Sequence, residues 1–372
     1  MLNASLLSTL LFVSLAQPEP AEPVAGADAP APTSTTAEQP ASTPDSAPPE
    51  AEPEPEPSTE PTQPETSEPE ATPTTTAVVP SDRTEASSTG NSGEFKRHKI
   101  VYNNLTAIRI NPLGVFNGFS LGYKYNLFNK PDSTLLRNSH LGINFTPNLS
   151  PALVGLGGSV VFEPLAVLRL TARYSYVQYF GSFQYFQSFE SPESDYSDAR
   201  LDAGKEAGEN YTTGGHNLYL STLLQGKVGP VVVRNELLFA YVNYSFNNAT
   251  DTTWYDIQYD ILQPKVGWTL RNESDILYLS KFGLTAGLRH TLTHVLGYPG
   301  FEGINPNGPT SRLGPLLAYT FYDRPEKKFN KPTLLLIAQW WLQHRYRAGQ
   351  AHSQALPQIV LGFSFSGELW KK

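Results

Sequence analysis

The chain has 372 residues and a formal net charge of −8, but its composition and charge are distributed very unevenly. Residues 17–94 hold 17 of the 32 prolines, 16 of the 35 acidic residues and one basic residue, Arg83, so their formal charge is −15. Residues 95–372 carry a charge of +7 and 42 aromatic residues among 278. This division excludes a single soluble globule. The absence of cysteine excludes a disulfide framework, thiolate metal ligands and a cysteine-anchored lipoprotein.

A short apolar run opens the chain, from Ser5 to Leu15, and Ser14 and Ala16 are small residues at the positions that a signal peptidase reads. We therefore predict a signal peptide over residues 1–16. The run is shorter than the roughly 20 residues that a membrane helix needs. No Lys or Arg precedes it, which departs from the usual pattern of a signal peptide.

Residues 17–94 are rich in Pro, Glu and Thr, as in the segment EPEPE at 52–56. Such a segment has few side chains that could offset the entropy of ordering, so it is predicted to be disordered. We expect it to lie in the periplasm, either as a tether that engages peptidoglycan or periplasmic export components, or as a solvated spacer without a partner.

From Leu105 onward, apolar and polar residues alternate with the period of two that is typical of β-strands. Phe119, Leu121 and Tyr123 alternate with Ser120, Gly122 and Lys124, for example. The pattern predicts about twelve strands, at 103–111, 115–127, 139–148, 153–163, 166–180, 214–227, 231–247, 252–270, 277–291, 312–323, 333–347 and 356–370. The parity of the apolar face changes within 252–270, which predicts a β-bulge near Gln263 and Pro264.

These segments are about twice as long as the strands of a soluble sandwich, and each could cross a bilayer when tilted. Tight connections near 163–165 and 228–230 alternate with long ones at 181–213 and 292–311. Alternating short and long connections are typical of transmembrane barrels. The fold class is therefore predicted to be all-β, an antiparallel transmembrane barrel over residues 95–372.

Aromatic residues gather near the strand ends that carry the long loops, and we predict that they form a girdle where lipid meets water. The predicted girdle residues are Tyr179, Phe180, Tyr241, Tyr244, Trp254 and Tyr255.

The signal segment, the alternating strands and a closing strand at 359–370 together resemble the outer-membrane β-barrel proteins of Gram-negative bacteria. The resemblance implies a location in the outer membrane, with outer-membrane lipid and lipopolysaccharide as partners. It implies no substrate. The usual terminal aromatic residue is absent because Lys371 and Lys372 follow Trp370, whose parity differs from that of Phe363 and Phe365.

Three motifs of enzymes and metal sites occur, and each has a simpler interpretation. Residues 118–122 match G-x-S-x-G, but Ser120 lies inside a predicted strand instead of at a strand-to-helix elbow. His290 and His294 would lie about 13 Å apart on a strand, too far to share one zinc ion, so a position at the barrel rim is expected. The acidic loop residues lack the spacing of a defined calcium loop, and they are Glu190, Glu193, Asp195, Asp198, Asp202, Glu206 and Glu209. No metal site, cofactor or nucleic-acid partner is expected.

Strand parity places many basic residues on the inner face of the barrel, against the few inward acids Glu163, Asp256 and Asp260. The predicted pore-lining basic residues are Arg109, Lys124, Arg169, Arg173, Lys265, Arg289 and Arg345. They favour a narrow channel or export pore for anionic solutes or acidic polysaccharide. Alternatively, these residues pair with acids and fill the interior. The alternative functions are a structural or adhesive barrel with an envelope-tethering tail and, last, an outer-membrane hydrolase.

Overall fold

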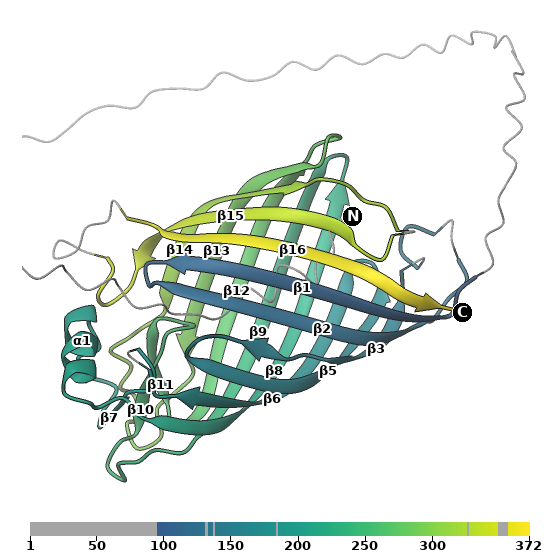
Figure 1. The fold of residues 1–372 in the computed structure, drawn as a ribbon. Coiled ribbons are helices and arrows are strands. Elements are labelled where there is room, and N and C mark those ends of the chain that lie inside the picture. Colours follow the sequence, from purple (N-terminus) through teal and green to yellow (C-terminus); the bar gives the residue numbers. More distant parts are fainter. Residues whose placement is uncertain (1–94, 131–132, 137, 184, 326, 349–355) are drawn as a thin grey trace, which may run out of the picture. The chain divides into compact units, whose positions relative to one another are not determined.

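The computed structural model describes residues 95–372 except 131–132, 137, 184, 326 and 349–355. The predicted signal peptide and the predicted disordered segment, residues 1–94, lie outside the described residues. Residues 95–372 form a closed antiparallel β-barrel of twelve strands (Figure 1). The first six are β1 (His98–Ile110), β2 (Gly114–Asn126), β3 (His140–Phe145) continued by β4 (Asn148–Leu149), β5 (Leu153–Leu165), β6 (Leu168–Phe180) and β8 (Thr212–Val228). The other six are β9 (Val231–Tyr244), β12 (Val266–Leu279), β13 (Leu284–Val295), β14 (Thr310–Thr320), β15 (Asn330–Gln343) and β16 (Gln358–Lys371).

The barrel closes where the last strand pairs with the first, and β16 lies along β1 (Figure 1). The pairing runs from Ile110 opposite Ile359 to Lys99 opposite Lys371, with a register shift between Ile100 and Val101. This irregularity accounts for the changed parity of Trp370, because an extra residue in one strand turns the following side chains to the other face. Closure leaves no unpaired sheet edge.

The alternation of the sequence corresponds to an inner and an outer face. On β6, Tyr174 and Tyr176 are exposed on the outer face, whereas Ser175 and Val177 are buried inside. Apolar side chains such as Ile143, Leu156 and Leu288 are more than half exposed on the outer wall. A closed barrel with an apolar outer band is the architecture of outer-membrane β-barrel proteins, so the predicted fold class is confirmed.

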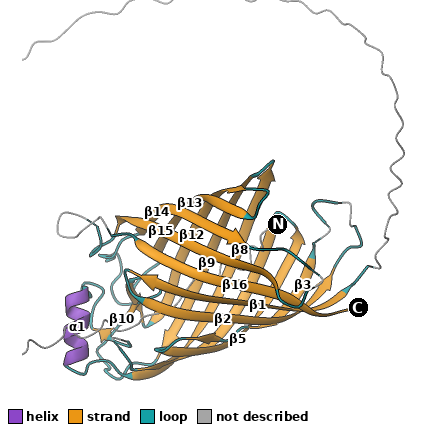
Figure 2. Cartoon of the chain, turned by 45° about the horizontal axis from the view of Figure 1, so that its top comes forward, coloured by secondary structure: helices purple, strands orange, loops and turns teal. Residues whose placement is uncertain are grey.

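The two ends of the barrel differ. One end, which we call the terminal end, holds His98 and Lys371 and the tight turns 166–167 and 229–230. The other, which we call the loop end, carries helix α1 (Asp198–Glu206) and the short strand β10 (Thr253–Asp256) (Figure 2). The short strands β7 (Ser188–Phe189) and β11 (Ile261–Pro264) lie at the same end (Figure 1). Ser197 caps α1 by accepting a hydrogen bond from the Arg200 backbone N–H. No helix among the described residues is long and apolar enough to cross a membrane.

The prediction of one strand over 252–270 is wrong, and so is the bulge near Gln263 and Pro264. Residues 253–264 form the separate hairpin β10–β11, which belongs to a second, three-stranded sheet with β7. The eighth barrel strand, β12, begins only at Val266. The parity change that we attributed to a bulge therefore marks the boundary between two elements. This displacement also moves the next strand, predicted at 277–291, to 284–295.

We expect the purified protein to migrate in a detergent gel as a compact band that shifts to the unfolded mobility only after heating. The reason is that every barrel strand is paired on both sides, so no edge is available for progressive unfolding. Circular dichroism should show a β spectrum, and a mainly helical spectrum would contradict the fold.

Candidate functional site in the lumen

The hairpin β10–β11 lies inside the barrel. Every residue from 253 to 264 is buried, although this segment takes no part in the barrel wall. At one side, the Thr269 hydroxyl on β12 donates to the Gln263 side chain over 2.7 Å. At the other side, Arg109 on β1 donates to the backbone oxygens of Ile257, at 2.8 Å, and Gln258, at 3.4 Å. Because β1 and β12 are five steps apart in the ring of twelve strands, the hairpin crosses the lumen.

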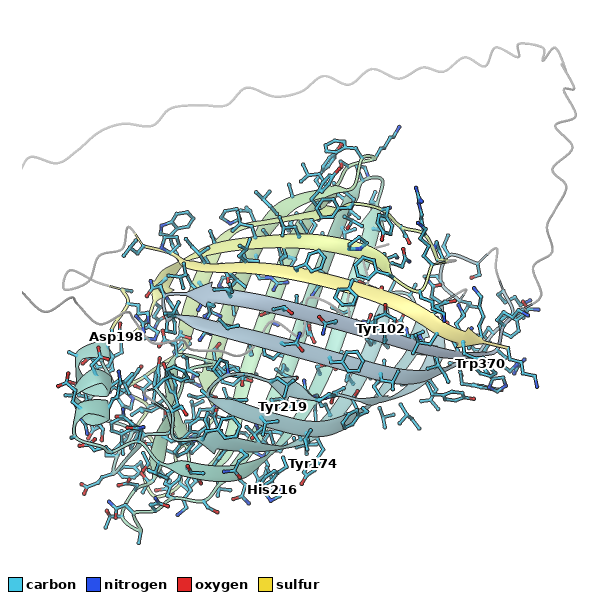
Figure 3. All side chains as sticks on the ribbon, viewed as in Figure 1. Tyr102, Tyr174, Asp198, His216, Tyr219 and Trp370 are labelled. Carbon is cyan, nitrogen blue, oxygen red and sulfur yellow. The ribbon has the colours of Figure 1, made fainter. Side chains whose placement is uncertain are left out.

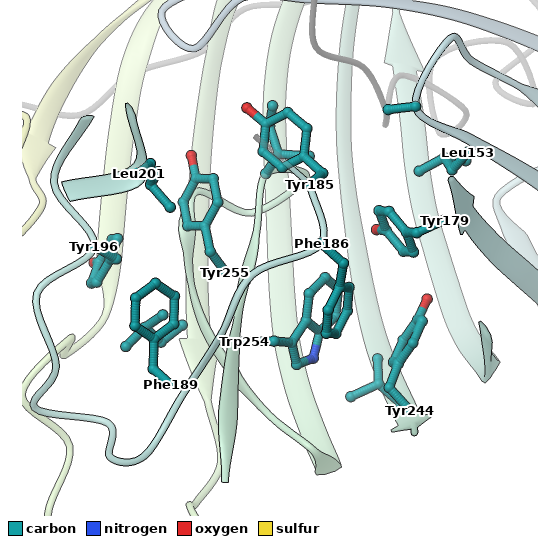
Figure 4. Close-up of a cluster of buried hydrophobic side chains, with 14 of the residues drawn as sticks. Leu153, Tyr179, Tyr185, Phe186, Phe189, Tyr196, Leu201, Tyr244, Trp254 and Tyr255 are labelled. Atoms are coloured by element: carbon teal, nitrogen blue, oxygen red, sulfur yellow. The ribbon is translucent and has the colours of Figure 1, made fainter. Parts of the chain in front are cut away.

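A cluster of aromatic side chains fills the lumen around the hairpin at the loop end (Figure 4). Phe186 stacks on Trp254 with ring centroids 4.7 Å apart, and Tyr244 lies 4.7 Å from the same indole. Tyr179 contacts Phe186 and Trp254 edge to face. Aromatic rings bury large apolar areas, so the cluster stabilises the hairpin inside the barrel.

This cluster corrects the predicted girdle. Tyr179, Tyr244, Trp254 and Tyr255 are each at most 2% exposed, so they do not face lipid. Strand parity alone predicts the inward position of Tyr179, because Tyr179 lies on the same face of β6 as Arg169 and Arg173. Its closeness to other aromatic residues in the sequence does not. Of the predicted girdle, Phe180 is 45% exposed on the outer wall, and Tyr241 lies outward against Trp268 with ring centroids 5.1 Å apart.

Arg347 holds the hairpin turn from the loop end. Its guanidinium pairs with the Asp260 carboxylate in the turn, with Asp198 on α1 at 2.8 Å, and with the Asn111 side chain at 3.0 Å. The His344 ring contacts the Asp260 backbone oxygen at 2.6 Å. We call Arg347, Asp260 and Asp198 the latch. The latch links the hairpin to two loops that are distant in sequence.

The buried acid of the latch, Asp260, is strongly held in its ionised form. Burial alone would raise the pKa of Asp260, but the charge of Arg347 and the neighbouring His344 outweigh it and lower that pKa below its ordinary value. A depressed folded-state pKa gives stability that is present above the unfolded pKa of about 3.9 and is lost as the pH falls below it. The latch is therefore intact at neutral pH. By contrast, burial raises the pKa of Asp256 to about 7. The hydrogen bonds that Asp256 accepts from the Gln258 N–H and the Gln263 amide lower this pKa, but burial has the larger effect.

Two predicted pore-lining residues do not lie on the barrel wall. Arg345 follows the end of β15 and donates to the backbone oxygens of residues 192–194, so it fixes a loop. Lys265 lies between β11 and β12, with its ammonium 5.0 Å from the Phe246 ring centroid. The prediction is wrong for both because it extended strand parity into connections.

On the wall formed by β9, β12 and β13, basic residues are paired with acids. Asp275 binds Arg289 in a bidentate manner, at 2.7 and 2.9 Å, and lies 3.0 Å from Arg234. Glu273 lies 3.1 Å from Arg289 and 3.7 Å from Arg271. We call these five residues, with Glu236, the charge ladder. Glu273 and Asp275 are not among the predicted inward acids because they fall between the strands predicted at 252–270 and 277–291.

A space of about 1420 Å³, which includes open solvent, runs from Lys124 and His140 near the terminal end to Gln258 in the hairpin turn. Strands β1–β8 line most of it, and Glu236 and Arg271 of the charge ladder line its other side. Of its four lining cations, Arg169 pairs with Glu163 at 2.5 Å, and Arg271 belongs to the charge ladder. The other two are Lys124 and Arg173. Within the described part of the chain, neither has a carboxylate within 4.0 Å; the Arg173 guanidinium lies 5.6 Å from the Tyr219 ring centroid. Tyr219 is marked in Figure 3.

The motifs noted in the sequence lie on strands. Ser120 lines the cavity from within β2, where there is no strand-to-helix turn. His290 and His294 lie on the outer face of β13, and His290 is in the middle of the strand, so the expected rim position is wrong for it. Among the residues that the structure describes, no group of three His, Asp or Glu side chains is arranged to hold a metal ion.

No family model and no curated protein matches the chain. Similar solved structures include a KdgM porin, which is 9% identical, with 72% of this chain and 97% of that chain covered and a TM-score of 0.31. Another is the translocator domain of the autotransporter NalP from Neisseria meningitidis, which is 8% identical, with 72% and 87% covered and a TM-score of 0.33. A third is the CymD monoaromatic hydrocarbon channel, which is 8% identical, with 73% and 88% covered and a TM-score of 0.32. The fold assignment rests on the strand pairing of the chain itself.

We predict that Asp275→Ala destabilises the barrel by about 3–5 kcal/mol, because it removes the bidentate partner of Arg289 and leaves buried guanidiniums short of negative charge. Asp323→Ala is the matched control, since its pair with Lys331 is partly exposed, and such pairs are worth about 1 kcal/mol or less. Urea unfolding in lipid or detergent measures both. Equal stabilities for the two variants would show that the charge ladder contributes nothing specific.

Proposed function

We propose that this protein is a gated channel of the outer membrane whose lumen favours anionic solutes, acidic polysaccharide among them. The observation that carries the proposal is the cavity with Lys124 and Arg173 uncompensated, covered on the loop side by a hairpin that belongs to a loop instead of the wall. Uncompensated cations in a narrow, partly desolvated space attract anions and repel cations.

The same arrangement indicates how such a channel would be closed. The barrel wall is continuous, so a path for solute requires that β10–β11 move out of the lumen. Loop segments can move without breaking the hydrogen bonds of the barrel, whereas a wall strand cannot. The latch joins the hairpin to the loops at 198 and 347, so a movement of these loops would release the hairpin or hold it in the lumen.

We further propose that the loop end faces the exterior and the terminal end the periplasm, so that residues 17–94 extend into the periplasm. Long external loops and short periplasmic turns are the usual arrangement in outer-membrane barrels. The apolar outer band would then contact outer-membrane lipid and lipopolysaccharide. Peptidoglycan or export components remain the proposed partners of residues 17–94.

A structural or adhesive barrel is the second candidate. It is favoured by the charge ladder and the aromatic cluster, which fill the lumen along β9, β12 and β13 and at the loop end. Such a barrel would conduct no ions in a planar bilayer under any condition, including after removal of the hairpin.

The anion preference is tested with the double variant Lys124→Gln/Arg173→Gln. In a salt gradient across a bilayer, the intact protein should show a reversal potential that favours chloride over potassium, and the double variant should lose most of this preference. Lys205→Gln on the exposed helix α1 is the control and should leave the reversal potential unchanged. Cation preference in the intact protein would contradict the proposal.

Gating is tested separately with Arg347→Gln, which removes the cation of the latch and leaves the Asp260 carboxylate buried without its main partner. We expect a several-fold higher open probability, because the closed hairpin loses a buried ion pair. Arg200→Gln, which removes the exposed pair with Glu209 and a contact with the Phe189 ring but leaves the three latch residues in place, is the control. Identical single-channel records for all three proteins would show that the latch does not control opening.

A further inference from the structure

A row of polar side chains interrupts the apolar outer wall of the barrel. Asn235 on β9, Ser274 on β12 and His290 on β13 stand directly opposite one another across three neighbouring strands. Asn272 on β12 and Ser311 on β14 extend the row, and all five side chains are partly exposed on the outer face. We call these five residues the polar seam. Figure 1 shows the neighbouring strands β12, β13 and β14 on one side of the barrel.

The polar seam lies at the height of the hydrocarbon core. On β12, the outward residues next to it are apolar, Leu270 on one side and Ile276 on the other. Beyond them lie Trp268 and Tyr278, at the two ends of the strand. Trp and Tyr mark the two lipid–water interfaces of a barrel, so Asn272 and Ser274 lie between the interfaces and not at the rim.

The polar seam is held by hydrogen bonds within the wall. The Asn235 amide donates to Asn272 at 3.0 Å and to Ser274 at 2.8 Å, and the Asn272 amide donates back to Asn235 at 3.2 Å. His290 contacts the Ser311 hydroxyl through Nε2 at 2.9 Å, while its Nδ1 makes no hydrogen bond within the described wall. The Ser274 hydroxyl also donates to Asn272 at 3.2 Å, and the Asn272 amide to the Glu236 backbone oxygen at 3.5 Å. Placing amide, hydroxyl and imidazole groups against hydrocarbon is costly even when they are hydrogen-bonded.

We propose that the polar seam is an interface with a second copy of this chain. In a dimer with a two-fold axis along the membrane normal, each seam meets its own copy, and a contact from one residue to another is made twice. Asparagine side chains suit such a contact because each carries both a donor and an acceptor. Polar side chains that pair across membrane-embedded surfaces also remove their exposure to lipid.

The chemistry of the polar seam argues against a lipid headgroup as its occupant. The seam contains no Lys, Arg, Asp or Glu, so it offers no charge to a phosphate or to a bound cation. Its position between Trp268 and Tyr278 is also away from the headgroup region. A neutral, membrane-embedded surface with matching donors and acceptors is what a second seam supplies.

The proposal is tested with the triple variant Asn235→Leu/Asn272→Leu/Ser274→Ala, which removes the amide network as a unit and presents apolar groups to lipid. The full chain should form dimers in lipid nanodiscs or mild detergent, and the variant should associate at least about tenfold more weakly, a loss comparable to one net hydrogen bond. Light scattering coupled to size-exclusion chromatography measures the mass. A monomeric intact protein at all concentrations, or a variant that dimerises as tightly as the intact protein, would overturn the proposal.

The far wall provides a matched control. Asn104, Thr106 and Asn117 form a smaller hydrogen-bonded polar group on the outer face of β1 and β2. The variant Asn104→Leu/Thr106→Val/Asn117→Leu should leave the dimer intact. If this variant dissociates the dimer, the interface lies on the other wall and the proposal is wrong.

Cysteine cross-linking decides the question without a large change of the wall. Because the chain contains no cysteine, Ser274→Cys introduces a single thiol that oxidation should join to its copy in membranes. Asn117→Cys should remain unjoined under the same conditions. Cross-linking at Asn117 alone, or at neither position, counts against the seam as an interface.

Discussion

The charge ladder is the interaction on which the interior of this barrel depends. Closing twelve strands turns Arg234, Arg271 and Arg289 toward an interior with little water, where an unpaired guanidinium is costly. Glu273 and Asp275 offset that cost, because they alternate with Arg271 along β12 and reach the arginines of the neighbouring strands on both sides. Paired charges therefore occupy the β9–β13 side of the lumen, and the remaining space lies along the opposite wall.

The hairpin β10–β11 divides that remaining space. Its residues are buried among aromatic rings toward the loop end, and its turn meets Arg109 and Arg347. What remains toward the terminal end is the cavity with Lys124 and Arg173. A channel through this barrel would therefore depend on one loop element. With the hairpin inside, the lumen is covered from the loop side, and with the hairpin displaced, a partly basic path would extend along β1–β6.

Much of the wall could be predicted from the sequence, because the period of two determines both strand type and the face of each side chain. Parity alone places Arg173 and Arg289 inward and Leu121 outward, and in the structure Arg173 lines the cavity, Arg289 is buried and Leu121 is exposed. The hairpin could not be found in this way. Its apolar residues Tyr255, Ile257, Tyr259 and Ile261 alternate with polar residues as in a wall strand. Apolar residues are favoured both where a side chain is buried in the lumen and where it faces lipid, so the pattern does not distinguish the two positions.

The pairing of charges was harder to predict than their direction. If 253–264 is assigned to the wall, Glu273 and Asp275 fall in a turn, and few acids are predicted in the lumen, whereas both residues lie on β12. The latch could not be predicted from the sequence for a different reason. Arg347, Asp260 and Asp198 belong to three connections between wall strands, and they come together only when the barrel is closed. Local patterns determine strands well, whereas contacts between loops depend on the whole fold.

The central claim is that residues 253–264 occupy the lumen, and hydrogen–deuterium exchange of the intact protein in lipid tests it most directly. Their backbone groups are buried and pair between β10 and β11, so these amides should exchange slowly, at rates close to those of the wall strand β12. Exchange as fast as that of the exposed loop residues Glu302 and Gly303 would show that the hairpin is a surface loop and would contradict its placement in the lumen.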